Sequence, residues 1–168
     1  IITVQAEAYY QQYGLNTAVV IPNNAYGPGD NFDRESSHVI PSLIRKCLEK
    51  QTPLVVWGDG TPTRDFLYVE DFAEGVILAA EKMDYQDGYI NIGSGVETSI
   101  KELVTTIMNL TGYDGKIIYD HSKPNGQPQR SVDIGKAKQI LEFKSKYSLA
   151  EGLKETIDWY KKMEKAKA

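Results

Sequence analysis

A short, uninterrupted apolar run that ends in proline limits the possible folds of this chain. Residues 17–21 read Thr-Ala-Val-Val-Ile and are followed by Pro22. Such a run, without polar alternation, is typical of a strand buried on both faces, as in a parallel sheet. Residues 89–93, Tyr-Ile-Asn-Ile-Gly, are predicted to form a second core strand. The residues before the first strand, Ile1–Tyr13, are predicted to form a helix that ends at Gly14.

Helical patterns alternate with the predicted strands. Two capping boxes, Ser99-x-x-Glu102 and Ser148-x-x-Glu151, each mark the start of a helix. Further helices are expected from about residue 38, over 70–83 and over 133–141. Further strands are expected over 53–57, 64–69 and 116–119, and a long loop is expected over 23–37. Strands that alternate with helices predict an α/β fold.

Composition narrows the class of protein. The 168 residues carry a formal charge of −4, which argues against a general nucleic-acid binder because such proteins carry a basic face. Cys47 is the single cysteine, so no intrachain disulfide can form. No apolar run approaches the roughly 20 residues of a membrane span, and no signal-peptide pattern is present. We therefore expect a cytoplasmic protein that binds neither nucleic acid nor membrane.

The first candidate site follows the first buried strand. Pro22, Asn23, Asn24 and Ala25 lie where a parallel sheet presents its carboxyl edge, which is where ligands bind in open α/β sheets. Asparagine amides can donate to and accept from a cofactor or a sugar. The structural alternative is a turn in which each asparagine caps its own backbone.

A second candidate site lies at the start of the helix after the long loop. His38 precedes the helix, and Arg45 and Lys46 lie further along it. A helix N-terminus and nearby cations favour an anion. The alternative is an ordinary charged helix surface.

Two glycine-containing stretches complete the candidates. In residues 57–65 an indole, Trp57, and a guanidinium, Arg64, stand at the two ends of a glycine-rich loop. A planar base could stack on the indole while the guanidinium holds a phosphate, unless Trp57 belongs to the core. Residues 123–130 are a stretch rich in amides with cations at both ends, Lys123 and Arg130, and would otherwise be a plain loop.

Several catalytic signatures are absent from the sequence. There is no glycine-rich dinucleotide fingerprint, no Walker loop and no Cys/His spacing for a metal, so no metal site is expected. Residues 93–95, Gly-Ser-Gly, follow a strand but lack the third glycine.

The candidate segments resemble one known family. Residues 24–28, 57–71 and 91–95 are similar to the extended short-chain dehydrogenases, the NAD(P)-dependent sugar-nucleotide epimerases, dehydratases and reductases. Residues 29–32, 37–41 and 122–128 resemble the GDP-L-fucose synthase branch of that family. The resemblance implies the C-terminal part of a Rossmann-type NAD(P)-binding fold plus a smaller α/β substrate-binding lobe.

The resemblance also implies domains and roles. Residues 1–24 and about 89–112 would contribute to the Rossmann-type sheet, and the rest would form the substrate lobe. The substrate would be a GDP-linked sugar, with NADP or NAD as cofactor and a homodimer as the assembly. Residues 22–25 and His38 would bind the cofactor, and His38 is also a candidate catalytic acid or base. Substrate contacts would come from Lys46, Trp57, Arg64, Lys123 and Arg130.

The implied reaction is the 3,5-epimerisation and 4-reduction of GDP-4-keto-6-deoxy-mannose. The family's catalytic Tyr-x-x-x-Lys pair would lie just before Ile1, where the chain begins inside a predicted helix without methionine or cap. We therefore expect a fragment, inactive alone, whose cofactor-binding N-terminal part is absent. Two alternatives stay open: a UDP-sugar 4-epimerase or dehydratase of the same family, and a non-catalytic sugar-nucleotide-binding module.

Overall fold

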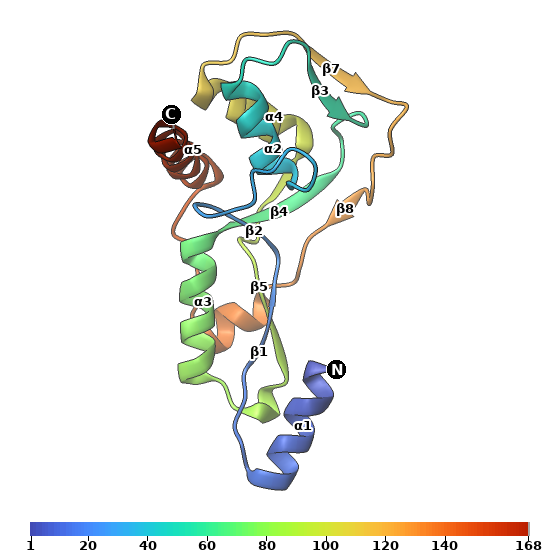
Figure 1. Cartoon of the computed structure of the whole chain (residues 1–168). Helices are drawn as coiled ribbons and strands as arrows, with labels where there is room; N and C mark the ends of the chain where they lie inside the picture. Colours follow the sequence, from blue (N-terminus) through green and yellow to red (C-terminus); the bar gives the residue numbers. More distant parts are fainter. Residues whose placement is uncertain (168) are drawn as a thin grey trace. The chain divides into compact units, whose positions relative to one another are not determined.

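The computed structural model describes residues 1–167, and the chain divides into two compact units. The first unit comprises Ile1–Ala25, Asp65–Val96 and Ser131–Lys146, and the second comprises Tyr26–Arg64, Glu97–Arg130 and the chain from Tyr147 onward. Both units combine helices with strands in parallel pairs (Figure 1). The predicted α/β class is therefore confirmed.

In the first unit, strands β1 (Val19–Pro22) and β5 (Tyr89–Ile92) pair in parallel, with Val19 opposite Tyr89 and Pro22 opposite Ile92. The unit also contains helices α1 (Ile2–Tyr13) and α3 (Val69–Lys82), the short helix η1 (Tyr85–Asp87) and the π-helix η2 (Ala137–Leu141). Its core consists of Leu67, Ala79, Met83, Ile90, Ile92, Ala137, Leu141 and Phe143. The two apolar segments predicted to be buried strands thus lie side by side over α3 and η2.

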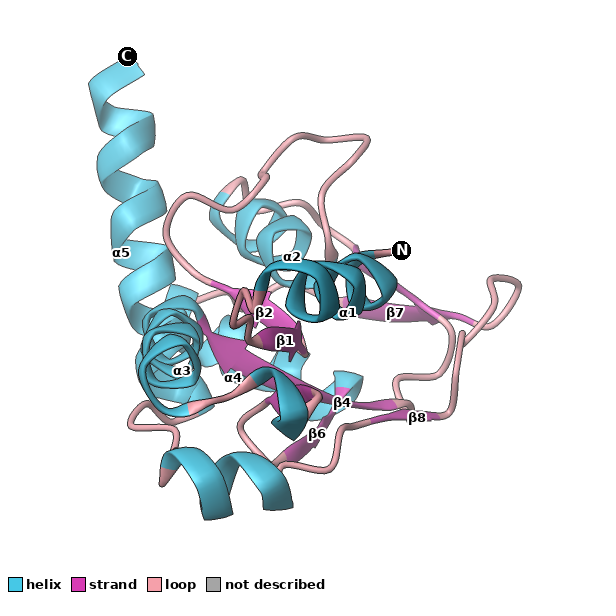
Figure 2. Cartoon of the chain, turned by 90° about the horizontal axis from the view of Figure 1, so that it is seen from below, coloured by secondary structure: helices cyan, strands magenta, loops and turns pink. Residues whose placement is uncertain are grey.

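In the second unit, three helices bury their apolar faces against one another. These are α2 (Val39–Leu48), α4 (Ile100–Thr111) and α5 (Leu149–Lys167), and Figure 2 shows α5 as one continuous helix. The buried side chains include Ile40, Leu43, Ile44, Leu103, Val104, Ile107, Leu153 and Ile157. Strand β3 (Leu54–Trp57) pairs in parallel with β7 (Ile117–Asp120).

A third sheet has the strand order β2-β4-β6, with β8 paired to β4. Its strands are β2 (Asn24–Tyr26), β4 (Thr63–Tyr68), β6 (Glu97–Ser99) and β8 (Gln129–Arg130). The segment 23–37, expected to be entirely loop, thus contains the short strand β2.

Both predicted capping boxes are present. The Glu102 carboxylate accepts from the Ser99 backbone N–H at 2.8 Å, and the Glu102 N–H donates to Ser99 Oγ at 3.1 Å. The corresponding distances for Ser148 and Glu151 are 2.8 and 3.3 Å. Each pair satisfies two backbone donors that a helix N-terminus otherwise leaves free.

The two compact units have other bounds than the expected domains, and the assignment of the chain to a sheet part and a substrate lobe stays a prediction. Residues 97–112, expected on the sheet side, lie in the second unit because the buried face of α4 packs on α2 and α5. Residues 65–88 and 131–146, expected in the substrate lobe, lie in the first unit, where α3 and η2 cover β1 and β5. Amphipathic periodicity shows that a helix has a buried face but not which elements cover that face.

Candidate functional site

Two loops of the second unit run side by side. The Gly58 N–H donates to the Asp120 carbonyl at 3.0 Å, and the Thr63 N–H donates to the Pro128 carbonyl at 2.9 Å. Beyond these points the same two segments continue as the parallel pairs β3–β7 and β4–β8 (Figures 1 and 2). The structure therefore brings the two glycine-containing stretches, 57–65 and 123–130, together.

Asn125 holds the two loops in register. Its Oδ1 accepts from the Asp59 N–H at 2.8 Å. Gly58 has φ +76°, and a Cβ at this position would lie 2.0 Å from Asn125 Oδ1. Only glycine allows both this backbone conformation and the close approach. This role of Asn125 was not predicted from the sequence, although the glycines at positions 58 and 60 were an available signal.

Trp57 projects outward from the end of β3. Its side chain is 64% exposed, and Lys123 Nζ lies 5.8 Å from the ring centroid. A cation at that distance from an indole face is within the range of a cation–π contact. The alternative of a core tryptophan is therefore wrong, and two of the expected substrate-binding residues are in contact.

Arg64 is half-buried and held by main-chain oxygens. Its Nη1 donates to the Thr63 carbonyl at 2.7 Å and to the Gln127 carbonyl at 2.8 Å. Arg130 is exposed and is the register partner of Arg64 in the parallel β4–β8 pair. Two guanidinium groups thus belong to neighbouring positions of one sheet. A pair of this kind suits an anion, because phosphate accepts charge-assisted hydrogen bonds from both.

A carboxylate fixes the shape of the first loop. Asp59 accepts from the Thr61 N–H at 2.9 Å and from Thr61 Oγ1 at 2.7 Å. These hydrogen bonds lower the pKa of Asp59 to about 2, so the group is ionised near neutral pH.

Arg45 and Lys46, the two neighbouring cations of helix α2, differ in their exposure to solvent. Arg45 is buried and pairs with Glu49 at 3.3 Å, whereas Lys46 is half-buried, and burial, helped by the charge of Arg45, lowers its pKa. His38 is the exposed N-cap residue of α2 and makes no side-chain capping bond. Within residues 1–167, no described hydrogen bond, ion pair or ring contact joins His38 or Lys46 to the two loops. Their place in one site with Trp57 remains a prediction.

The residues expected beside the cofactor lie at the end of β1, in the first unit. Asn23 is buried, and its Nδ2 has no hydrogen-bond partner within the part of the chain that is described. Asn24 Nδ2 donates to Asn23 Oδ1 at 3.2 Å and to the Asp65 carbonyl at 2.9 Å. The neighbouring Pro22 and Ala25 are exposed. The asparagine side chains therefore do not cap their own backbone, which was the structural alternative.

Asp65 organises the turn after β5. Its buried carboxylate accepts from the Ser94 N–H at 2.9 Å, from Ser94 Oγ at 2.5 Å and from the Gly95 N–H at 3.1 Å. The Asp65 backbone carbonyl also accepts a hydrogen bond from Asn24 Nδ2, so this one residue links the ends of β1 and β5. Sequence reasoning missed this role, although a carboxylate next to the apolar residues 66–69 was a visible sign.

The fold is of the α/β class with parallel strands; one unit carries polar side chains at a strand end, and the other carries a loop pair with three cations and an exposed indole. The family model described as "NAD dependent epimerase/dehydratase family" matches residues 1–93. The chain belongs to this family.

Individual relatives agree with that assignment. The chain is 43% identical over 160 residues to "Probable GDP-L-fucose synthase 1" of Oryza sativa subsp. japonica, covering 92% of this chain and 48% of the relative. It is 40% identical over 166 residues to "GDP-L-fucose synthase" of Escherichia coli K12, covering 92% and 51%. The crystal structure of a Thermotoga maritima UDP-glucose 4-epimerase with UDP-glucose matches with a TM-score of 0.86 and 31% identity, covering 96% and 51%. The chain thus spans about half the length of the curated relatives it matches.

Proposed function

We propose that this chain supplies the sugar-nucleotide site of an NAD(P)-dependent epimerase/reductase that acts on a GDP-linked sugar. The reaction proposed for the whole protein is the 3,5-epimerisation and 4-reduction of GDP-4-keto-6-deoxy-mannose. Identity of 43% and 40% to relatives named GDP-L-fucose synthase, over more than nine-tenths of the chain, supports this choice.

The observation that best supports this function is the pair of loops at residues 57–64 and 120–130. Trp57 offers an exposed aromatic face, and Arg64, Lys123 and Arg130 lie on the same two segments. A nucleotide diphosphate needs a surface on which a base can stack and cations that hold phosphate oxygens. In a chain of net charge −4 these three cations outnumber the two carboxylates of the same segments, Asp59 and Asp120, and the local excess of positive charge favours an anionic ligand.

In the proposed complex the base stacks on Trp57, and Arg64 and Arg130 bind the diphosphate. Arg64 is already oriented by the Thr63 and Gln127 carbonyls, so little side-chain freedom is lost when the ligand binds. Lys46 would add a further positive charge; burial lowers the pKa of this half-buried side chain, and a bound anion would favour its charged form.

The proposed cofactor is NADP or NAD, which supplies the hydride when it is bound. Pro22, Asn23, Asn24, Ala25 and His38 are the proposed contacts. The buried Nδ2 of Asn23, which lacks a described partner, fits a ligand that brings a hydrogen-bond acceptor to the end of β1. His38 would move a proton during epimerisation; its side chain is exposed and is not tied up in capping the helix that it precedes.

The test uses the full-length protein. NADPH oxidation with GDP-4-keto-6-deoxy-mannose, together with calorimetric titration of GDP and UDP, is expected to show turnover and tighter binding of GDP. The absence of both turnover and GDP binding would overturn the proposal.

A UDP-sugar 4-epimerase is the second candidate, favoured by the structural match to the UDP-glucose 4-epimerase. Tighter binding of UDP than of GDP, with turnover of a UDP-sugar, would select this reaction or a dehydratase. A non-catalytic binding module would bind nucleotide without turnover, and its full-length sequence would lack a Tyr-x-x-x-Lys motif upstream of Ile1.

For the assembly we propose a homodimer in which α1 takes part. Exposed apolar side chains on this helix support the proposal, namely Ile2, Val4, Tyr9 and Tyr13. No helix in the described residues is long and apolar enough to cross a membrane. A cytoplasmic location is proposed from Cys47, a buried thiol that is not in a disulfide.

A further inference from the structure

The loop that leads into α2 is a compact unit closed by its own hydrogen bonds. The Asp33 carboxylate accepts from the Glu35 N–H at 2.9 Å, the Ser36 N–H at 3.0 Å and Ser36 Oγ at 2.9 Å. Asn31 Nδ2 donates to Ser36 Oγ at 2.9 Å, and the Ser37 N–H donates to the Asp33 carbonyl at 3.2 Å. These bonds connect the loop so that a shift at one residue is passed to the others.

One aromatic side chain attaches this loop to the C-terminal helix. The Phe32 ring stacks on Tyr160 with centroids 4.1 Å apart and an interplanar angle of 14°, and it lies 6.0 Å from the Trp159 ring at 41°. Phe32 is thus in ring contact with two aromatic side chains of α5, and contacts between aromatic rings contribute beyond their buried area. Phe32 and both partners belong to the second unit.

A second attachment lies on the other side of the loop. Arg34 pairs with Glu49 at 3.0 Å, but the Arg34 side chain is 74% exposed. An exposed ion pair is screened by solvent and salt and contributes little. The half-buried Phe32 stack is therefore the stronger of these two attachments, and just before the loop Tyr26 Oη donates to the Leu149 carbonyl of α5 at 3.2 Å.

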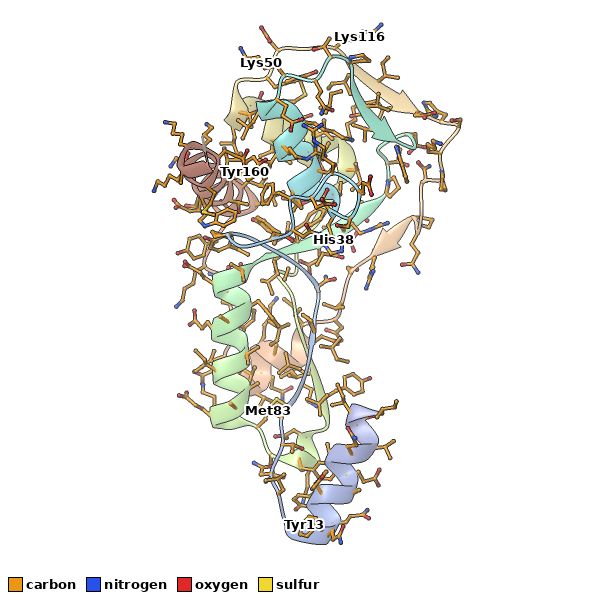
Figure 3. The ribbon with its side chains drawn as sticks, viewed as in Figure 1. Tyr13, His38, Lys50, Met83, Lys116 and Tyr160 are labelled. Carbon is orange, nitrogen blue, oxygen red and sulfur yellow. The ribbon has the colours of Figure 1, made fainter. Side chains whose placement is uncertain are left out.

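The loop ends at His38, the N-cap residue of α2. Ser37, bonded to Asp33, immediately precedes His38, whose carbonyl accepts from the Ser42 N–H at 3.0 Å. Figure 3 labels His38 at the start of α2 and Tyr160 on α5. The backbone on both sides of the imidazole is thus fixed, by the loop on one side and by the helix on the other.

We propose that Phe32 and Tyr160 are positioning residues for His38: the stack of their rings holds the loop 27–37 on α5 and so sets where the imidazole stands. The inference rests on the proposed function, because it takes His38 as the residue that moves a proton. It adds to that function a dependence of the reaction on the C-terminal helix.

The experiment compares variants of the full-length protein. Phe32→Ala is expected to lower kcat about tenfold or more with KM unchanged, because a small displacement of an acid or base slows the chemical step without weakening ground-state binding. Tyr160→Ala should have the same effect, and the double variant should be no worse than either. Phe32→Tyr, which keeps the ring, should restore wild-type kcat.

Amide hydrogen exchange provides a readout that does not need turnover. Exchange at Ser36 and Ser37 should rise in Phe32→Ala and return to the wild-type rate in Phe32→Tyr, even if the substrate proposed above is wrong. Unchanged exchange in a folded Phe32→Ala protein would overturn the attachment. Raised exchange with unchanged kcat in an active enzyme, or a loss confined to KM, would overturn the positioning of His38.

Discussion

Arg64 and Arg130 are register partners on two parallel strands, although they lie far apart in the sequence. Like charges at paired positions repel one another and disfavour the pairing. The Arg64 guanidinium is steadied by the Thr63 and Gln127 carbonyls, which accept from it without neutralising its charge. Such a pair is most stable with an anion bound, so we expect GDP to raise the thermal stability of the second unit.

Replacing Arg64 with alanine should weaken GDP binding about tenfold or more, because a charge-assisted hydrogen bond to phosphate is worth about 1.5–3 kcal/mol. Removal of its two carbonyl contacts should also lower the free energy of unfolding by about 1 kcal/mol. Titration calorimetry and denaturant unfolding measure the two effects. Lys116→Ala removes an exposed charge at the start of β7 and serves as the control; an equal loss of affinity there would show a general charge effect.

Trp57→Ala should weaken GDP binding by about 1–3 kcal/mol, the range for a base stacked on an aromatic side chain. Since the side chain is 64% exposed, the free energy of unfolding should change by less than about 1 kcal/mol. Trp57→Phe keeps a stacking face and should retain most of the affinity. A Trp57→Ala protein that binds GDP as tightly as the wild type would exclude stacking on this ring.

Gly58→Ala tests the close approach of Asn125. The substitution should destabilise the protein and weaken GDP binding, because the new Cβ would meet Asn125 Oδ1. Gly29→Ala is a matched control: Gly29 has φ +86° but nothing within 4 Å of a Cβ, so it carries the backbone penalty alone. Unfolding and GDP titration of both variants measure the difference. Adding Asn125→Ala to Gly58→Ala should relieve the clash, and failure to do so would argue against it.

Cys47 should be unreactive in the folded protein. Burial raises the pKa of its thiol to about 11, so at pH 8 almost all of it is the protonated thiol and not the nucleophilic thiolate. A disulfide reagent should label Cys47 slowly at pH 8 and rapidly after denaturation. The folded rate should rise with pH up to about 11 while the fold persists. Rapid labelling of the native protein at pH 7 would contradict the buried position.

The sequence was most informative where one local interaction decides the structure. The two capping boxes, Ser99–Glu102 and Ser148–Glu151, place their helix starts through bonds between residues three apart. The strands β1 and β5 were recognisable as short apolar segments, but the expected burial on both faces is wrong: Ile21 of β1 is 40% exposed and Tyr89 of β5 is 58% exposed, while Ile90 and Ile92 are buried.

Contacts between distant segments were not readable in this way. Asp65 receives hydrogen bonds from a turn about 30 positions away, and Asn125 reaches across 66 positions to Asp59. The periodicity of apolar residues along the sequence does not indicate which distant residues such side chains will contact. The exposure of Trp57 was likewise not predictable from the sequence, because a strand with an apolar sequence can still expose alternate side chains, as β3 does.

The contact between the Arg64 guanidinium and the Gln127 carbonyl spans 63 positions, which sets an order of events during synthesis. At about 5–20 residues per second, some 3–13 s separate the emergence of the two segments from the ribosome. Until then Trp57 and Arg64 have no second loop to join, and closing so long a segment costs conformational entropy before any contact repays it. The proposed nucleotide site is consequently absent from the nascent chain until the second loop has emerged, and translation beyond residue 130 is a precondition for ligand-assisted folding.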